Sequence, residues 1–430
     1  MKQLLQTLIL DFQNAIPDAG IGREMHYEVL PKKAFICIGV RRCGKSTLLY
    51  QIADKLLQGG ASKENLLYIN FMDDRLQPLK QNGLEPILDA YFSLYPEKKQ
   101  SESVHFFFDE IQEIPGWELF ITRVLHNEKG QVYITGSSSR MLSKEIATEM
   151  RGRSVSWELF PFSFSEFLVF NKTNIKPGTS KNNLLLNKAF LSWFKVGGFP
   201  ETITVSDKLR IKVHQEYFQT ILLRDVIERN DAAHPRAVMD LAHRLLSVTG
   251  SLYTCNRLYE YLVSIGHKIS KDFISDVLQW MEDAYFLFSV KLYSRSIAKQ
   301  NTNPKKIYCV DHAFPDAIHS SKSEDLGHRL ESAVFMRLRS LGYEIFYYKT
   351  EAGKEIDFIA KESGKIVSFV QVSLSLADKE TKEREVDSLF EGMKELSLSE
   401  GTIVTLEESD EIRRKQYKIN IVPAWRWFLE

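Results

Sequence analysis

Short apolar runs alternate with amphipathic segments between residue 34 and about residue 160. Four apolar runs predict buried strands: AFICIG (34–39), LLYINF (66–71), VHFFFD (104–109) and QVYITG (131–136). Helical periodicity occupies the intervals between them, at 45–57, 84–95 and 117–127. Strands that alternate with helices indicate a parallel sheet wrapped by helices. Because the strands are almost continuously apolar, we expect both faces of this sheet to be covered.

The alternation stops after about residue 160, and helical periodicity then dominates up to residue 245, with breaks at 171–183 and 197–200. Residues 246–312 predict helix, turn, helix and a two-stranded ribbon around the loop 296–304. An α/β pattern returns further on, with a helix at 326–341, a strand at 344–348, a hairpin at 355–372, a helix at 382–396 and a strand at 402–405. The N-terminal stretch predicts an amphipathic helix, because Gln3, Gln6 and Asp11 interrupt its apolar positions.

Length and composition agree with several globular domains. A chain of 430 residues exceeds one ordinary hydrophobic core, and 44% hydrophobic with 26% charged residues is typical of globular proteins. We expect an N-terminal helical segment at 1–28, a parallel-sheet core at 29–165, a helical region at 166–245, a ribbon-bearing module at 246–312 and a second α/β domain at 325–430. Basic and acidic residues balance at 56 each, so global charge does not indicate nucleic-acid binding but leaves room for a local basic patch.

Neither a membrane segment nor a disulfide framework is expected. No apolar run approaches the roughly 20 residues that span a bilayer. The four cysteines are scattered, without a CxxC pair or a zinc-type spacing to histidine. This is typical of buried or incidental thiols in a reducing compartment, so we expect a cytoplasmic protein.

The segment from Gly39 to Ser46, GVRRCGKS, satisfies the phosphate-loop pattern G-x-x-x-x-G-K-[ST]. It follows a predicted strand and opens a predicted helix, which is the context that phosphate binding requires. Gly39 and Gly44 permit a backbone whose N–H groups face phosphate oxygens. We expect Lys45 to act catalytically by bridging the β- and γ-phosphates of ATP, and Ser46 to hold Mg²⁺. The expected nucleotide-binding set comprises Gly39, Arg42, Cys43, Gly44, Lys45, Ser46, Thr47 and, from the next motif, Asp109.

The run VHFFFDE (104–110) supplies the second half of the predicted site. Its apolar residues place Asp109 at the C-terminal end of a central strand, where parallel sheets bind ligands. We expect Asp109 to hold the Mg²⁺ shell through water and Glu110 to polarise the attacking water as general base. The alternative is an Asp-Glu pair that merely begins a solvated loop, and the neighbouring phosphate loop makes it the weaker interpretation.

Two further groups are candidates for the γ-phosphate. Ser137 and Ser138 follow the strand after Asp109, where a hydroxyl can orient water or sense the phosphate. Ordinary turn chemistry explains the same serines equally well. Arg151 and Arg153 are candidates to stabilise the transferred phosphoryl group, in cis or in trans, although solvated arginines at a helix end are an equally good interpretation.

Several strings together resemble prokaryotic AAA-like ATPases that carry a C-terminal domain of unknown function of the 4143 type. They are GVRRCGKSTLL, FFFDEIQEIPGWE, ITGSSSRMLSKE, RGRSV, LFPFSFSEF, GGFPE and YFQTILLRDVIERN. The resemblance implies an α/β protein with a P-loop AAA-like core, a helical region, a winged-helix-like module and a tail related to restriction endonucleases. It also implies ATP sites between protomers, hence a homo-oligomer in which Arg153 reaches a neighbour's γ-phosphate.

Residues 251–310 are compatible with a winged helix, in which Ser270 caps the second helix. The stretch from residue 290 to residue 310 has no acidic residue and carries Lys291, Arg295, Lys299, Lys305 and Lys306. Such a wing suits a DNA phosphate backbone. The alternative is a dimerisation or inter-domain module with solvated lysines, and nucleic-acid contact is only slightly favoured over it.

Glu331, Asp357 and Gln371 follow the order that the resemblance to restriction-type nucleases implies, in which acids hold Mg²⁺ and a lysine positions water. Ser373 stands where that lysine belongs. Lys354 or Lys382 would have to replace it from another position. We therefore favour a degenerate structural or nucleic-acid-holding domain over an active nuclease.

Three functions remain open at this point. The first is an ATP-driven enzyme that acts on nucleic acid, in DNA remodelling or defence. The second is a nucleotide-controlled signalling or scaffold ATPase whose tail binds proteins. The third and weakest is an ATP-regulated nuclease.

Overall fold

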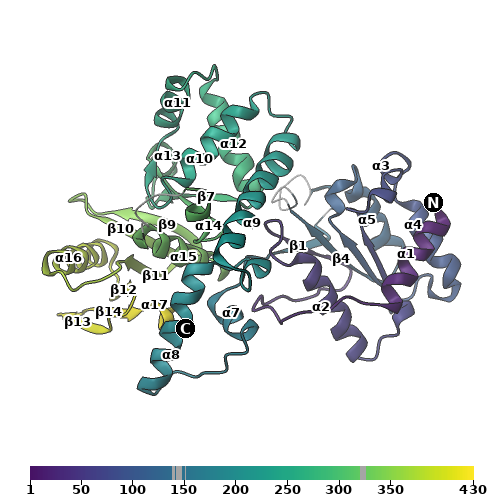
Figure 1. The fold of residues 1–430 in the computed structure, drawn as a ribbon, viewed down its shortest axis with the longest axis horizontal. Helices are drawn as coiled ribbons and strands as arrows, with labels where there is room; N and C mark the ends of the chain where they lie inside the picture. The colour runs from purple at the N-terminus through teal and green to yellow at the C-terminus, as the bar shows by residue number, and fades with distance from the viewer. Residues whose placement is uncertain (138–140, 142–147, 151, 320–325) are drawn as a thin grey trace. The chain divides into compact units, whose positions relative to one another are not determined.

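The computed structural model describes residues 1–137, 141, 148–150, 152–319 and 326–430. The chain divides into two compact units (Figure 1). The first comprises residues 1–160 and 283–285, and the second comprises 161–282 and 286–430. Among the described residues, none of the helices combines the length and the apolar character that crossing a bilayer requires.

The first unit is built on a five-stranded sheet, ordered β2-β3-β4-β1-β5. Its strands are β1 (Ala34–Ile38), β2 (Leu66–Asn70), β3 (His105–Asp109), β4 (Gln131–Gly136) and β5 (Ser154–Glu158). Every neighbouring pair is parallel, which confirms the predicted parallel core. The apolar runs did not predict β5, whose five residues are all only partly buried. An edge strand has one free side, so its sequence carries a weaker apolar signal than that of a central strand.

Helices complete the first unit: α1 (Lys2–Asn14), α2 (Lys45–Gln58), α3 (Leu79–Asn82), α4 (Glu85–Leu94) and α5 (Trp117–Asn127). Short 3-10 turns occupy Lys63–Asn65, Asp74–Leu76, Pro96–Lys98 and Ile111–Glu113. The N-terminal amphipathic helix is confirmed, since α1 buries Leu5, Ile9 and Phe12 and packs against α4 and β2. Figure 1 shows α1 in purple beside α4.

The second unit begins with helices α7 (Phe164–Phe170), α8 (Ser180–Val196), α9 (Asp207–Thr220) and α10 (Pro235–Leu246). A π-helix at Ile221–Glu228 continues α9, and a 3-10 turn occupies Pro200–Thr202. Next come β6 (Leu252–Tyr253), α11 (Cys255–Ser264), α12 (Lys271–Asp283), β7 (Leu287–Leu292), α13 (Ile297–Thr302), β8 (Lys305–Cys309) and α14 (Phe314–Ile318). The predicted ribbon is therefore β7 and β8, which pair antiparallel, but its connecting loop contains the helix α13.

The glycines of GGFPE are explained by a contact with a distant carboxylate. Gly197 has a φ of 82°, and a Cβ on it would lie 2.5 Å from Asp311 Oδ1. The Gly198 N–H donates to Asp311 Oδ2 at 2.6 Å. Only residues without a side chain let the backbone approach the carboxylate this closely at a left-handed φ. The motif thus joins α8 to the segment that follows β8.

The tail completes a nine-stranded mixed sheet, ordered β13-β14-β12-β11-β10-β9-β7-β8-β6. Its own strands are β9 (Glu344–Lys349), β10 (Glu355–Glu362), β11 (Lys365–Val372), β12 (Glu400–Thr405), β13 (Asp410–Arg414) and β14 (Tyr417–Pro423). Its helices are α15 (Leu326–Ser340), α16 (Lys379–Leu396) and α17 (Ala424–Trp427). The parallel pair β7–β9 joins the ribbon to the tail, so the modules expected at 246–312 and 325–430 share one sheet.

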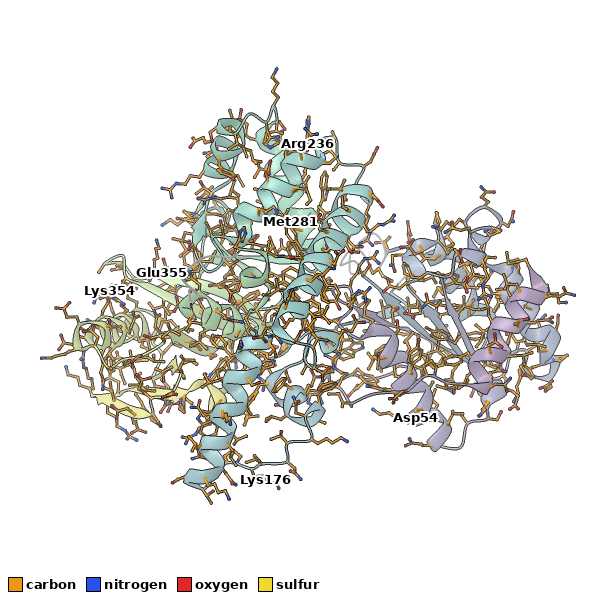
Figure 2. All side chains as sticks on the ribbon, viewed as in Figure 1. Asp54, Lys176, Arg236, Met281, Lys354 and Glu355 are labelled. Atoms are coloured by element: carbon orange, nitrogen blue, oxygen red, sulfur yellow. The ribbon has the colours of Figure 1, made fainter. Side chains whose placement is uncertain are left out.

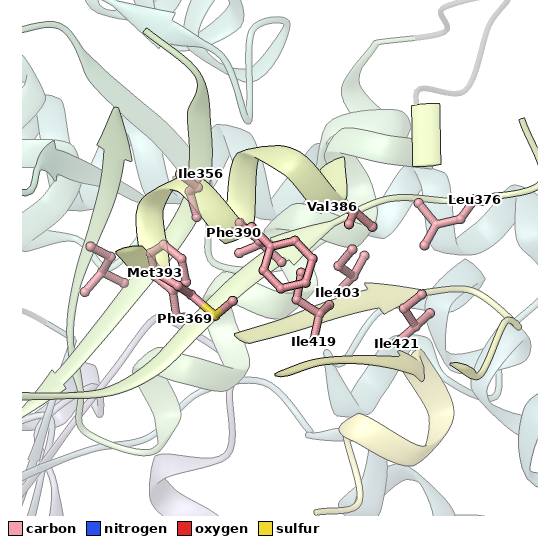
Figure 3. Packing of buried hydrophobic residues seen from close by; sticks show 11 residues of the cluster. Ile356, Phe369, Leu376, Val386, Phe390, Met393, Ile403, Ile419 and Ile421 are labelled. Carbon is pink, nitrogen blue, oxygen red and sulfur yellow. The ribbon is translucent and has the colours of Figure 1, made fainter. Parts of the chain in front are cut away.

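The core of the tail lies between α16 and the sheet (Figure 3). Helix α16 contributes Val386, Leu389, Phe390 and Met393 to a buried apolar cluster. The strands contribute Ile356, Ile359, Phe369, Ile403, Ile419 and Ile421. Since each side chain is removed from water, this burial is the main driving force that holds α16 on the sheet.

Candidate active site

The phosphate loop connects β1 to α2 in the first unit. A Cβ on Gly39 would lie 2.0 Å from the Leu159 carbonyl oxygen, so no other residue fits there. Gly44 caps the N-terminus of α2 with a φ of 104°, and Arg42 has a φ of 65°. Left-handed residues inside a short loop curve the backbone so that successive N–H groups can face one anion. Together with the free N–H groups at the start of α2, this loop provides a phosphate-binding concavity.

Lys45 is buried and held by three acceptors. Its ammonium donates to the carbonyl oxygens of Gly39 and Val40, both at 3.1 Å, and lies 3.3 Å from Glu110 Oε1. Burial opposes the charged form, but the Glu110 carboxylate and other nearby acidic groups raise the pKa of Lys45 above its ordinary value. Lys45 therefore carries its charge at the position where phosphate oxygens would replace these acceptors.

Asp109 ends β3 and is fully buried. The Tyr68 hydroxyl donates to Asp109 Oδ2 at 2.7 Å, the Asn70 amide donates to the same oxygen at 3.1 Å, and the Thr135 hydroxyl donates to Oδ1. The Ser46 hydroxyl is a further hydrogen-bond partner. Burial and the neighbouring Glu110 raise the pKa of Asp109. The two residues predicted to hold Mg²⁺ therefore lie in direct contact, and their oxygens fit the preference of this cation for hard ligands.

Glu110 adopts a left-handed backbone, with a φ of 54°. Its N–H donates to Thr135 Oγ1 at 2.9 Å, and its carboxylate accepts from the Gln112 amide at 2.6 Å. Burial opposes ionisation, but Lys45 and then the Gln112 hydrogen bond lower the pKa of Glu110 below its ordinary value. The carboxylate is therefore ionised, as a proton acceptor must be.

Gln112 connects Glu110 to the strand end that carries Ser137. Its amide nitrogen lies 3.4 Å from Ser137 Oγ, and both residues belong to the first unit. Ser138 and Arg151 lie outside the described residues. Motif reasoning did not single out Gln112, Tyr68 or Asn70, because none belongs to the phosphate-loop pattern. Their only signal was polar character beside a run of buried apolar residues.

Arg23 is another residue that motif reasoning did not single out. Its guanidinium donates to the Cys43 carbonyl at 2.8 Å and to the Phe160 carbonyl at 2.6 Å. Gly44 lies beneath it, since a Cβ there would approach Arg23 Nη1 to 3.2 Å. The segment before β1 therefore supports the phosphate loop from outside. Bonds to carbonyl oxygens twenty or more residues away leave no pattern in the local sequence.

Arg153 lies far from the phosphate loop of its own chain. Its carbonyl accepts from the Ala34 N–H at 2.8 Å, at the beginning of β1, whereas the loop follows the end of β1. Five residues of strand separate the two places by about 16 Å. The backbone of Arg153 thus enters the edge strand β5 at the opposite end of the sheet.

The tail brings two of its three expected acidic-site residues together. Glu331 on α15 and Asp357 on β10 are both bonded to one ammonium, that of Lys306 on β8. Gln371 is turned differently: its amide oxygen accepts from the Asp357 N–H at 3.2 Å, and its nitrogen donates to Glu385 at 2.7 Å. The described residues contain no group of three or more acidic, histidine or cysteine side chains arranged for a metal ion.

The expected substitutes for the missing lysine lie elsewhere. Ser373 donates to the Ser375 carbonyl at 3.0 Å, within its own loop. Lys354 pairs with Glu391 at 3.0 Å and Lys382 pairs with Asp410 at 3.1 Å, so neither ammonium is directed to the acids. Figure 2 labels Lys354 beside Glu355, at the start of β10.

Expecting Lys306 in a basic wing was wrong. The side chain is buried and paired with acids, so it cannot meet a phosphate backbone. The alternation of side chains along β8 explains why Lys306 is buried beside the more exposed Lys305, because successive residues of a strand face opposite sides of the sheet. Lys305, Arg295 and Lys299 stay partly or fully exposed, whereas Lys291 donates to Asn301 at 3.0 Å.

Family profiles and solved structures were found that are similar to parts of this chain. An "AAA domain" profile matches residues 31–168, and domains of unknown function match 187–324 (DUF8612) and 326–427 (DUF4143). The Aeropyrum pernix Orc1 protein in complex with DNA is similar in structure at a TM-score of 0.34 and 14% identity, covering 74% of this chain and 91% of that one. AMPPCP-bound DnaA from Aquifex aeolicus gives a TM-score of 0.26 at 13% identity, covering 65% of this chain and 86% of that one.

Two relatives are similar in sequence. An uncharacterized protein of Haemophilus influenzae is 31% identical over 71% of this chain and 74% of its own length. The uncharacterized protein MJ1544 of Methanocaldococcus jannaschii is 32% identical over all of this chain and 96% of its own length. The sheet order, the phosphate loop and the profile match together identify the first unit as a P-loop ATPase domain of the AAA type. In this chain, an AAA domain is followed by the domains of unknown function DUF8612 and DUF4143, and the chain belongs to the family of MJ1544.

Proposed function

We propose that this protein binds ATP with Mg²⁺ and hydrolyses it at the phosphate loop. The observation that carries the proposal is the contact between Lys45 and Glu110 beside the buried Asp109 and its hydrogen-bond partner Ser46. A cation for the phosphates, an ionised carboxylate for water and two hard ligands for a metal thus converge at one edge of the sheet.

In the proposed reaction, Lys45 exchanges the carbonyls of Gly39 and Val40 for phosphate oxygens. Bound Mg²⁺, held by Ser46 and through water by Asp109, would neutralise charge on the β- and γ-phosphates. Once Lys45 turns to the phosphates, Glu110 is free to accept a proton from water. The water oxygen bonds to the γ-phosphorus, and the bond from phosphorus to the β,γ-bridging oxygen breaks, which releases ADP and phosphate.

Gln112 and Ser137 are proposed to link this chemistry to the state of the γ-phosphate. The Gln112 side-chain nitrogen donates to the Glu110 carboxylate at 2.6 Å and lies 3.4 Å from the Ser137 hydroxyl oxygen. A γ-phosphate that attracts Ser137 would alter the position of Gln112 and, through it, of Glu110. Release of phosphate from ATP by the purified protein, with and without Mg²⁺, tests the basic activity. ATP binding without any Mg²⁺-dependent release would reject the hydrolysis step.

The proposed target of the ATPase is nucleic acid, contacted through the winged-helix-like segment around β7 and β8. Arg295 and Lys299 are exposed there, and Lys305 is partly exposed. The structure removes Lys306 from this patch, which leaves a smaller positive surface than the sequence predicts. This reduction is the specific observation that favours the second candidate, a nucleotide-controlled scaffold whose tail binds proteins.

One experiment separates these two candidates. The ATPase rate is measured alone and with a panel of single-stranded, duplex and branched DNA, for the wild type and for the double variant Arg295→Glu/Lys299→Glu. An enzyme working on DNA is stimulated by at least one member, and the variant loses that stimulation while keeping its basal rate. An unchanged rate with every member supports the scaffold function instead. Salt titration of DNA binding adds a second readout, since each lost phosphate contact flattens the slope.

A further inference from the structure

Lys306 occupies the centre of an acidic cluster in the tail. Its ammonium lies 2.8 Å from Glu331 Oε1, 2.9 Å from Glu355 Oε1 and 2.9 Å from Asp357 Oδ1. The Tyr308 hydroxyl also donates to Glu331 Oε1, at 2.5 Å. Lys306 is only 2% exposed, and Glu331 and Asp357 are also buried. Three elements that are distant in sequence, β8, α15 and β10, therefore meet at one cation.

Two of the three N–H donors of this ammonium make hydrogen bonds, to Glu331 and Asp357. The Glu355 carboxylate is a third ion-pair partner. Asp357 has its second oxygen engaged as well, because Oδ2 accepts from the Val372 N–H at 3.0 Å. Burial alone disfavours a charged lysine, but Tyr308 and the surrounding carboxylates raise the pKa of Lys306 well above its ordinary value. The lysine is therefore a permanent cation.

The contacts have the geometry of an ion pair and leave no place for a metal between the same oxygens. Separations of 2.8 to 2.9 Å are those of charge-assisted N–H···O bonds. A magnesium ion would need oxygens at about 2.0 to 2.1 Å in an octahedron. It would also have to share these carboxylates with an ammonium of like charge. Gln371, the third residue of the nuclease-like order, is already bonded to the backbone of Asp357 and to Glu385.

We propose that Lys306 is the resident cation of this acidic site, in the place where a divalent metal would otherwise be held. The cluster then joins the ribbon strand β8 to α15 and β10 and does not cleave phosphodiester bonds. Glu331, Glu355 and Asp357 act as the receptor for an internal ammonium. This assignment does not depend on the ATPase site, which lies in the other unit.

The proposal predicts that the cluster becomes a divalent-cation site when the ammonium is removed. Lys306→Met keeps an unbranched chain that is shorter only by the terminal atom, but it leaves three acidic side chains without their cation. Removing one partner of a buried ion network is strongly destabilising, because charge remains without compensation. A divalent cation that binds the vacated oxygens should restore part of the loss, since a ligand stabilises the state that binds it.

The test measures Mn²⁺ binding by electron paramagnetic resonance and the thermal midpoint with and without Mn²⁺, on the full chain without nucleotide. Lys365→Met is the matched control, because Lys365 is an exposed lysine at the start of β11. Wild type and control should show no Mn²⁺ bound at the cluster. Lys306→Met should have a lower midpoint, bind Mn²⁺ and recover part of the midpoint. The double variant Lys306→Met/Asp357→Asn should lose that recovery.

Any of three results would overturn the proposal. The wild-type protein could bind Mn²⁺ in a way that Asp357→Asn removes, or cut supercoiled plasmid with Mn²⁺ in a way that Glu331→Gln removes. The third result is a Lys306→Met protein that is as stable as the wild type without metal. If Lys306→Met does not fold, the triple variant Lys306→Met/Glu331→Gln/Asp357→Asn decides the matter. With the acids neutralised, the missing ammonium should be tolerated, and a triple variant that also fails to fold contradicts the assignment.

Discussion

Replacing Glu110 by Gln removes the negative charge beside Lys45 with almost no change in shape. The ammonium then keeps only the carbonyls of Gly39 and Val40 as strong acceptors. A hydrogen bond to a charged group contributes about 1.5 to 3 kcal/mol. We take the lower end, because the pair is 3.3 Å apart and the Gln oxygen still accepts. The nucleotide-free protein should thus be destabilised by about 1.5 kcal/mol, and ATP should bind roughly tenfold more tightly.

Hydrolysis should change in the opposite direction. Loss of a general base lowers turnover by about 10²- to 10⁴-fold. Titration with a fluorescent ATP analogue and release of phosphate in single-turnover conditions measure the two effects separately. Glu113→Gln is the matched control, since Glu113 makes the same charge change but pairs with Lys80 at 3.6 Å. A Glu110→Gln protein that hydrolyses ATP at the wild-type rate would refute the assignment of the base.

Three further predictions concern single residues. Lys45→Ala should weaken ATP binding roughly hundredfold, measured by the same titration, because it removes the ammonium that faces the β- and γ-phosphates. Arg153→Ala should bind ATP but lose most hydrolysis. Mixing it with Lys45→Ala protein should restore activity, because a mixed interface pairs an intact phosphate loop with an intact arginine. A monomeric protein whose specific rate does not depend on its concentration contradicts this. Burial and Asp357 raise the pKa of Glu331 to about 7. Between pH 4.5, the ordinary pKa of a glutamate, and about pH 7, only the folded state keeps this proton. The free energy of unfolding of the wild type should therefore fall as pH rises through that range. Glu331→Gln should flatten that slope in denaturant titrations, and an unchanged slope would exclude Glu331 as its source.

At the proposed ATP site, local sequence patterns predicted most of the site residues but not all of them. Phosphate loops are contiguous, and their flanking strand and helix are specified by periodicity, so the positions of Gly39, Gly44 and Lys45 were predictable. Asp109 was predictable for the same reason, as the end of an apolar strand. Gln112 was not, because its importance comes from a 2.6 Å contact with Glu110 that only a turn between them creates.

The tail shows the opposite case. The order Glu331, Asp357 and Gln371 was visible in the sequence, and so was the absence of a lysine at Ser373. The cation that meets the acids is Lys306, which precedes Glu331 by 25 residues and Asp357 by 51. Because Lys306 is adjacent to Lys305 in sequence, the pair indicated a solvated basic run. In the strand, however, neighbouring side chains face opposite sides, so Lys306 lies in the interior of the protein.

By itself, the sequence determined the parallel core, the phosphate loop and the residue types that surround it, because periodicity and motif spacing act over short stretches of chain. Only the tertiary structure decided where Arg153 lies relative to its own loop, which ribbon lysine is buried, and that the ribbon and tail share one sheet. Each of these depends on pairing between segments distant in sequence. Such pairing is decided by the total burial and charge compensation of the folded chain, and no single stretch of residues contains that information.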